Sequence, residues 1–188
     1  MGRRRLSRGT LRYESYVQLL GSEKVFTGAF VDVARKRYRR ADGSEVEREV
    51  VEHPGSVGVV AYDERFVYLV RQPREAVEHD RLLEIPAGKI DPGESALTCG
   101  KRELAEEVGL AAERWSELQT IYASPGYVDE AIVIYAATRL TEVDPDPDDE
   151  EQIELVRLPV AEIDSALPGI ADAKTLVGLM LLKRELGR

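Results

Sequence analysis

The segment from Gly88 to Leu110 constrains this chain of 188 residues more than any other part of it. A helical pattern runs from about Ser95 to Val108. Within it Glu103, Glu106 and Glu107 stand at i, i+3 and i+4, so their carboxylates emerge on one face. Like charges at this spacing destabilise an isolated helix, and the ordinary interpretation is a solvated acidic face. The alternative is a cation site, because hard divalent ions prefer oxygen ligands.

Nine positions of this segment form the pattern G-x5-E-x7-R-E-U-x-E-E-x-G-U, in which U is an aliphatic residue. The nine residues are Gly88, Glu94, Arg102, Glu103, Leu104, Glu106, Glu107, Gly109 and Leu110. At ordinary residue frequencies all nine match by chance with a probability on the order of 10⁻⁸ per starting point. The pattern therefore favours the cation site over a solvated face.

This pattern matches the Nudix box completely, so the chain resembles the Nudix hydrolases, which cleave nucleoside diphosphates linked to another moiety. The resemblance implies an α/β fold, an α/β/α sandwich with a mixed sheet, in which the box is a loop–helix–loop. It also implies a magnesium-dependent enzyme, with Mn²⁺ as a substitute. Bound divalent ions neutralise pyrophosphate oxygens and lower the pKa of a bound water.

The resemblance assigns a role to each charged residue of the box. The implied metal ligands offer oxygen atoms: Glu103, Glu107, Glu106, Glu94 and the carbonyl of Ala87. Glu106 is implied to act directly or through water, and Glu94 either to bind metal or to brace the loop. Arg102 is implied to orient the carboxylates during catalysis.

The residues that flank the box point to a substrate class. Leu83-Glu84-Ile85-Pro86-Ala87-Gly88 before it and Ser124-Pro125-Gly126 after it are similar to the ADP-ribose pyrophosphatase subfamily, which converts ADP-ribose to AMP and ribose 5-phosphate. The implied substrate contacts here are Glu84, Pro125, Gly126 and Glu130. Tyr127 lies near a tyrosine position of dinucleoside polyphosphate hydrolases, so that substrate class stays open.

The first part of the chain is polar and strand-like. Lys24–Ala34 and Glu45–Glu52 are β-prone runs, and residues 41–44 between them carry a hairpin signal. We therefore expect a small antiparallel β subdomain at 1–54, followed by the hydrolase domain at 55–188. Such a sheet has little core of its own and needs a partner surface. In the subfamily these strands exchange across a homodimer.

Two arginines and an aromatic residue outside the box are further implied substrate contacts. Arg48 in the N-terminal part and Arg74 in Val70-Arg71-Gln72-Pro73-Arg74 match arginines of the subfamily, and a guanidinium suits phosphate oxygens. Either could instead be a surface salt-bridge partner. Phe30 follows Ala29, which stands where some members stack an aromatic side chain on adenine.

The general base of the subfamily is commonly a glutamate on a loop after the box helix. The acidic loop at residues 144–152 precedes a predicted strand at Ile153–Leu158, and alignment by that strand places Glu151 first and Glu150 second. Its ordinary interpretation is a solvated acidic loop.

The remaining expected elements alternate between strands and helices. The strands are Val57–Tyr62, Phe66–Val70, Leu82–Ile85, Gln119–Ala123 and Ala131–Ala137, and a packed helix covers Ala171–Leu186. This order, with the box helix between strands, predicts one α/β sandwich.

Charge and cysteine usage limit the partners. The chain has 26 basic and 35 acidic residues, a net charge of -9, which argues against a nucleic-acid grip. No apolar run approaches the roughly 20 residues of a membrane helix. A single cysteine, Cys99, suits the reducing cytoplasm and fits buried packing. Two rival functions remain: a broad nucleoside diphosphate-sugar or dinucleoside polyphosphate hydrolase, and a non-catalytic Nudix domain that binds ADP-ribose.

Overall fold

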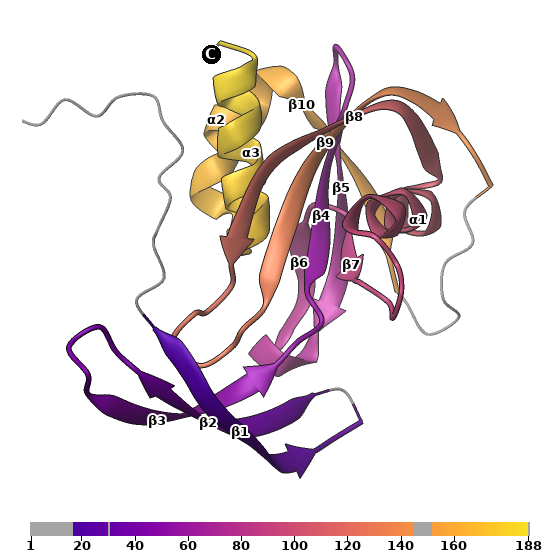
Figure 1. Cartoon of the computed structure of the whole chain (residues 1–188). Coiled ribbons are helices and arrows are strands. Elements are labelled where there is room, and N and C mark those ends of the chain that lie inside the picture. The colour runs from indigo at the N-terminus through magenta and orange to yellow at the C-terminus, as the bar shows by residue number, and fades with distance from the viewer. Residues whose placement is uncertain (1–16, 30, 145–151, 188) are drawn as a thin grey trace, which may run out of the picture. The chain divides into compact units, whose positions relative to one another are not determined.

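The structure, a computed structural model, describes residues 17–29, 31–144 and 152–187 (Figure 1). The chain falls into two compact units that divide between Val51 and Glu52. Each unit is described by itself.

The first unit is a three-stranded antiparallel sheet of β1 (Gln18–Thr27), β2 (Asp32–Arg39) and β3 (Glu45–Glu52) in that order. The β-prone run at 24–34 is not one strand, because a reversal closed by Gly28 N donating to Val31 O at 2.9 Å separates β1 from β2. The predicted turn at 41–44 is confirmed. Among its described residues, only Ala34 and Val50 are buried hydrophobics.

The second unit is built on a seven-stranded mixed sheet with the order β10-β5-β4-β9-β8, to which β6 adds beside β5 and β7 beside β4. Its strands are β4 (Ser56–Tyr62), β5 (Phe66–Arg74), β6 (His79–Glu84), β7 (Ala87–Lys89), β8 (Leu110–Tyr122), β9 (Ala131–Glu142) and β10 (Glu154–Pro159). The pairing of β4 with β9 is parallel, and the other recorded pairings are antiparallel.

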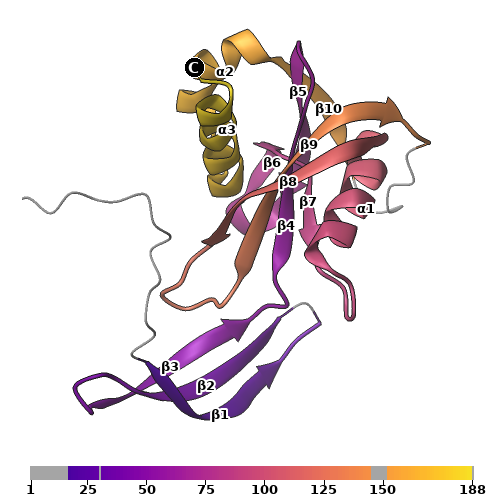
Figure 2. The ribbon, with the colours of Figure 1, turned by 45° about the horizontal axis from the view of Figure 1, so that its top comes forward.

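Two long helices cover opposite faces of this sheet, α1 (Ala96–Val108) and α3 (Ala173–Glu185), as Figures 1 and 2 both show. The central strand β4 is buried on both faces: Val57 and Val59 pack with α1, and Val60 packs with α3. This burial explains why β4 is a continuous apolar run. The fold is therefore the expected α/β/α sandwich with a mixed sheet. No helix among the described residues is long and apolar enough to cross a membrane.

Several elements differ from the sequence-based expectations. β8 begins at Leu110, well before the predicted 119–123, because its exposed edge positions are polar and hide the strand pattern. The short helix α2 (Ile163–Ala166) and the 3-10 turns at 75–77, 160–162 and 167–169 were not predicted. Strand β7 was also missed, since its three residues lie in a segment that signals a strand end.

Candidate active site

The box forms the predicted loop–helix–loop. Ser95 is the N-cap of α1, and its side chain accepts a hydrogen bond from Thr98 N at 3.1 Å. Gly109 ends the helix with φ of 69°, the left-handed conformation that glycine adopts without strain. On the other side, β7 pairs Ala87 and Gly88 with the central strand β4. Both ends of the acidic helix are therefore fixed to the sheet.

Two carboxylates of the box face inward. Glu103 is 8% exposed and Glu107 is 7% exposed, although both are acidic. The backbone N–H of Ala87 donates to Glu107 Oε2 at 3.0 Å. A Cβ atom added at Gly88 would overlap the carboxylate of Glu103, so glycine is needed for this close approach. The two buried carboxylates thus lie against the same Ala87–Gly88 backbone.

Arg102 lies at the centre of the box carboxylates. Its Nη1 donates to Glu103 Oε1 at 2.7 Å and to Glu106 Oε2 at 2.9 Å, while its Nη2 donates to Glu94 Oε2 at 3.2 Å. Hydrogen bonding to Glu94, together with the charge of Glu103, raises the pKa of Arg102 above its usual range. In turn Arg102 lowers the pKa of Glu94. We call Glu94, Arg102, Glu103 and Glu106, together with Glu107, the acidic cluster.

A divalent cation in the acidic cluster would need several oxygen donors close together. Among the described residues, no three His, Cys, Asp or Glu side chains converge as a metal site by themselves. Arg102 instead draws the carboxylates together. The chemistry of the donors still fits a hard divalent ion, because buried carboxylate oxygens beside a backbone loop are the ligands such ions select. The buried pair Glu103 and Glu107 would hold it.

Cys99 lies against the backbone of Gly88 and Lys89, and its surroundings make the thiol unreactive. The thiol is 0% exposed, and its Sγ is 3.4 Å from the carbonyl oxygen of Lys89. Burial, and the nearby charge of Glu103, raise the pKa of Cys99 to about 12. The predicted buried packing of this cysteine is confirmed.

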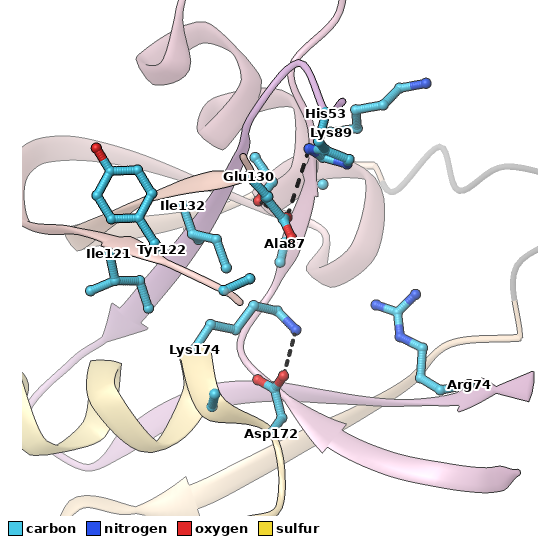
Figure 3. A pocket seen from close by; sticks show the side chains of 14 residues that line it. His53, Arg74, Ala87, Lys89, Ile121, Tyr122, Glu130, Ile132, Asp172 and Lys174 are labelled. Atoms are coloured by element: carbon cyan, nitrogen blue, oxygen red, sulfur yellow. Dashed lines mark hydrogen bonds and ion pairs between the residues drawn. The ribbon is translucent and has the colours of Figure 1, made fainter. Parts of the chain in front are cut away.

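A cavity of about 350 Å³ opens beside the loop that carries Ala87 and Gly88 (Figure 3). Its other lining residues come from the ends of β4, β5, β7, β8, β9 and α3: His53, Ser56, Arg74, Lys89, Ile121, Tyr122, Ala123, Glu130, Ile132, Asp172, Ala173 and Lys174. Two of the predicted substrate contacts, Arg74 and Glu130, are among them.

Arg74 and Lys174 share one buried carboxylate, Glu84, which is 0% exposed. Arg74 uses its Nε at 2.7 Å and its Nη2 at 2.9 Å, a side-on pair, and Lys174 Nζ donates to Glu84 Oε2. Burial alone would raise the pKa of Glu84, but the two cations outweigh it, so the pKa is lowered. Glu84 therefore lies behind Arg74 rather than on the cavity wall, where a predicted substrate contact would be.

The same network continues into helix α3. Lys174 Nζ donates to Asp172 Oδ1 at 3.0 Å, and Asp172 is the N-cap of α3 through Thr175 N at 2.9 Å. Thr175 Oγ1 in turn accepts from Ile85 N at 2.7 Å, next to Glu84. We call Arg74, Glu84, Asp172 and Lys174 the cationic cluster, because its two cations reach the cavity. The hydrogen bond to Glu84 raises the pKa of Arg74, and the charge of Glu107 adds to this shift. The two clusters therefore interact electrostatically.

Glu130 belongs to a third group on the cavity wall. Ser56 Oγ donates to Glu130 Oε1 at 2.7 Å, and His53 Nδ1 is 3.9 Å from the same oxygen. His53 Nδ1 accepts from Gly55 N at 3.1 Å, which orients the ring. Figure 3 shows His53 and Glu130 across the cavity from Lys174.

The other predicted site residues lie elsewhere. Pro125 and Gly126 form a turn in which Tyr127 N donates to Ser124 O at 3.2 Å, and neither lines the cavity. Arg48 is exposed on β3 of the first unit. Phe30, Glu150 and Glu151 lie outside the described residues.

Sequence reasoning missed most of the cavity residues, of which His53, Ser56, Lys89, Tyr122, Asp172 and Lys174 have polar side chains. For two of them a signal was present. Asp172 stands three residues before Thr175 at the start of an apolar helix, the pattern of a capped helix N-terminus, which places Lys174 in the first turn. The cavity itself required the fold.

These features define an α/β/α protein with a buried acidic loop–helix–loop beside a cavity that contains cationic side chains. The NUDIX domain model matches residues 52–177, and the chain belongs to the Nudix hydrolase family, whose members generally need divalent cations. It is similar to an ADP-ribose pyrophosphatase of Bacillus subtilis, with 30% identity over 87% of this chain and 91% of the relative.

Two further relatives agree on the family. A protein of Bacillus methanolicus named methanol dehydrogenase activator is 33% identical over 87% of this chain and 91% of its own length. A solved structure titled as an ADP compounds hydrolase is 26% identical, with a TM-score of 0.78 and coverage of 92% of this chain and 95% of that one. The relatives thus support Nudix hydrolase activity.

Proposed function

We propose that this chain hydrolyses the diphosphate of ADP-ribose or a related ADP-sugar and releases AMP and a sugar phosphate. The observation that carries the proposal is the buried pair Glu103 and Glu107 against Ala87–Gly88, at the rim of a cavity that also contains Arg74. Acidic groups suit a cation, and the guanidinium suits the diphosphate. The names of the relatives support the adenosine diphosphate part of the substrate.

Mg²⁺, with Mn²⁺ as a substitute, is the proposed cation. When bound, it would neutralise diphosphate oxygens and lower the pKa of a water molecule. Arg102 keeps Glu94, Glu103 and Glu106 together while the substrate exchanges. Glu151 is the proposed general base and Glu150 the second candidate, so each is to be replaced by glutamine and compared.

The remaining cavity residues would bind the substrate. Arg74 uses two N–H groups on Glu84 and has three more on its guanidinium, which suit a diphosphate oxygen pair. Glu84 then acts through Arg74, as a positioning residue. Glu130 is oriented by Ser56 and has carboxylate lone pairs for sugar hydroxyls.

We also propose that the chain works as a homodimer in which residues 1–54 are exchanged and complete the partner's adenine site, with 55–188 as the hydrolase domain. The thin core of the first sheet and its exposed apolar side chains, Leu19, Val25 and Phe26 among them, support this proposal. Arg48 and Phe30 would then contact the substrate. A cytoplasmic location completes the proposal, since a single buried cysteine suits a reducing compartment.

One panel of substrates tests the proposed function: ADP-ribose, ADP-glucose, GDP-mannose, diadenosine polyphosphates and NADH, with phosphate release measured after a coupled phosphatase. The proposal predicts that ADP-ribose has the highest kcat/KM. A flat profile contradicts the substrate assignment, and binding of ADP-ribose without turnover would favour the non-catalytic alternative. Light scattering of the same sample tests the dimer.

A further inference from the structure

Lys174 lines the cavity from a position at which the helix dipole does not favour a cation. It is the second residue of α3, directly after Ala173, in the first turn of a 13-residue helix. The N-terminus of a helix carries a partial positive charge, so a cation there is electrostatically opposed, whereas Lys183 in the last turn is favoured. Glu84 and Asp172 offset this cost and hold the lysine at the cavity wall.

The carboxylates beside Lys174 leave part of its ammonium group unused. The group has three N–H donors, and its recorded acceptors are one oxygen of Glu84 and one of Asp172. The side chain lines the cavity and is 13% exposed, so it is neither sealed in the core nor free on the surface. Figure 3 shows the ammonium group extending from α3 toward Asp172, with Arg74 on the opposite side of the cavity.

The two cations of the cluster line the cavity, and Glu84, the carboxylate that both of them contact, does not. Glu84 is 1% exposed in its side chain and lies behind both cations, while Arg74 is 40% exposed and Lys174 is 13% exposed. Glu84 is therefore buried behind the two cations, while Asp172, 15% exposed, lines the cavity beside Lys174. A diphosphate that enters meets two cations whose geometry is already fixed by a common carboxylate, which lowers the ordering cost of binding.

We propose that Lys174 binds the diphosphate of the substrate beside Arg74, as a second fixed cation of the site. This inference rests on the proposed function, and it adds a substrate-binding residue from α3. The competing explanation is that Lys174 is a brace that only holds Glu84. A brace affects stability, whereas a phosphate contact affects the affinity for phosphate-bearing ligands.

The test compares Lys174→Gln with Lys174→Arg and with Lys183→Gln, a control on the same helix whose lysine pairs with Asp164 away from the cavity. The dissociation constant of ADP is measured by calorimetry in EDTA, at two salt concentrations, together with the thermal midpoint of each variant. For Lys174→Gln we expect a loss of about tenfold in ADP affinity and a weaker salt dependence. Lys174→Arg should lose less than about threefold, because it keeps the charge.

Turnover adds a second readout. In Lys174→Gln the KM for ADP-ribose should rise by about tenfold while kcat changes by less than about threefold, and Lys183→Gln should match the wild type. An ADP dissociation constant within twofold of wild type, with a lowered thermal midpoint, would overturn the inference in favour of the brace. Failure of the wild type to bind ADP would also overturn it.

The wild-type protein gives an answer if Lys174→Gln does not fold. Acetylation of lysines by acetic anhydride is followed by peptide mass spectrometry with and without ADP. We expect ADP to slow the modification of Lys174 by about fivefold or more and to leave Lys183 unchanged. Equal rates at Lys174 would overturn the inference. Absent turnover of ADP-ribose would instead refute the proposed function, so the two failures are distinguishable.

Discussion

In both the acidic cluster and the cationic cluster, one central charged side chain contacts several side chains of the opposite charge. In the first, one cation, Arg102, holds Glu94, Glu103 and Glu106. In the second, one buried anion, Glu84, holds two cations that reach the cavity. A fixed central charge orients its partners before any ligand arrives, and this preorganisation reduces the cost of binding.

The two clusters differ in how the sequence encodes them. The acidic cluster is contained in residues 87–107, where helical spacing brings the side chains together. The cationic cluster joins residues 74, 84, 172 and 174, which only the sheet and the packing of α3 bring together. A compact motif therefore indicates the reaction class from sequence alone. The residues that we propose bind the ligand are distant from one another in the chain.

The largest effect is expected from breaking the acidic cluster at Glu107. Glu107→Gln keeps the shape but loses the charge that a cation needs, and kcat should fall by about 10³-fold with a similar thermal midpoint. Steady-state kinetics at saturating Mg²⁺ measure this, and Glu162→Gln, an exposed glutamate away from the cavity, is the control. Turnover near the wild-type value would exclude a metal role for Glu107.

The next effect comes from the backbone under the same cluster. A methyl group at Gly88 would overlap the carboxylate of Glu103, so Gly88→Ala must displace it and should lower kcat by about 10²-fold. At Gly169 an added Cβ meets nothing within 4 Å, and Gly169→Ala should behave as wild type. Similar activity in the two variants would show that the contact with Glu103 is unimportant.

The cationic cluster should respond in binding and stability together. Arg74→Ala removes the side-on pair and leaves Glu84 with Lys174 alone. We expect KM for ADP-ribose to rise by about 30-fold and the free energy of unfolding to fall by about 1–2 kcal/mol, a modest loss because Arg74 is 40% exposed. Urea denaturation and kinetics measure both. An unchanged KM would remove Arg74 from the substrate site.

The smallest effect is a pH dependence from Glu84. Its pKa in the folded protein is lowered below the ordinary value of 4.5, so the ionised form favours folding. That contribution is fully present above about pH 4.5 and is lost as the pH falls through the lowered pKa.

The measurement is the difference in unfolding free energy between wild type and Glu84→Gln. It should be constant from pH 7 to about pH 5 and shrink at lower pH. Glu154→Gln, which removes an exposed carboxylate paired with Arg81, should differ from wild type by less than about 1 kcal/mol. A difference for Glu84→Gln that grows on acidification would contradict the sign of the shift.

Much of the fold and one half of the site could be predicted from sequence. The helix predicted at about Ser95–Val108 and the apolar strand β4 depend on local pattern, and both were predicted. Strand β7 was missed because three residues between a proline and a loop carry no periodicity, although it anchors the acidic loop. Lys174 was missed because its partner Glu84 lies 90 residues away, and no local rule links them.

We propose that the acidic cluster, with a divalent cation, hydrolyses a diphosphate that the cationic cluster binds. The direct test follows ADP-ribose with the wild-type protein by ³¹P NMR, in Mg²⁺ and in EDTA. The account predicts that the diphosphate signals disappear in Mg²⁺ and are replaced by those of AMP and ribose 5-phosphate, while EDTA preserves them. An intact diphosphate in Mg²⁺, or equal hydrolysis in EDTA, would contradict it.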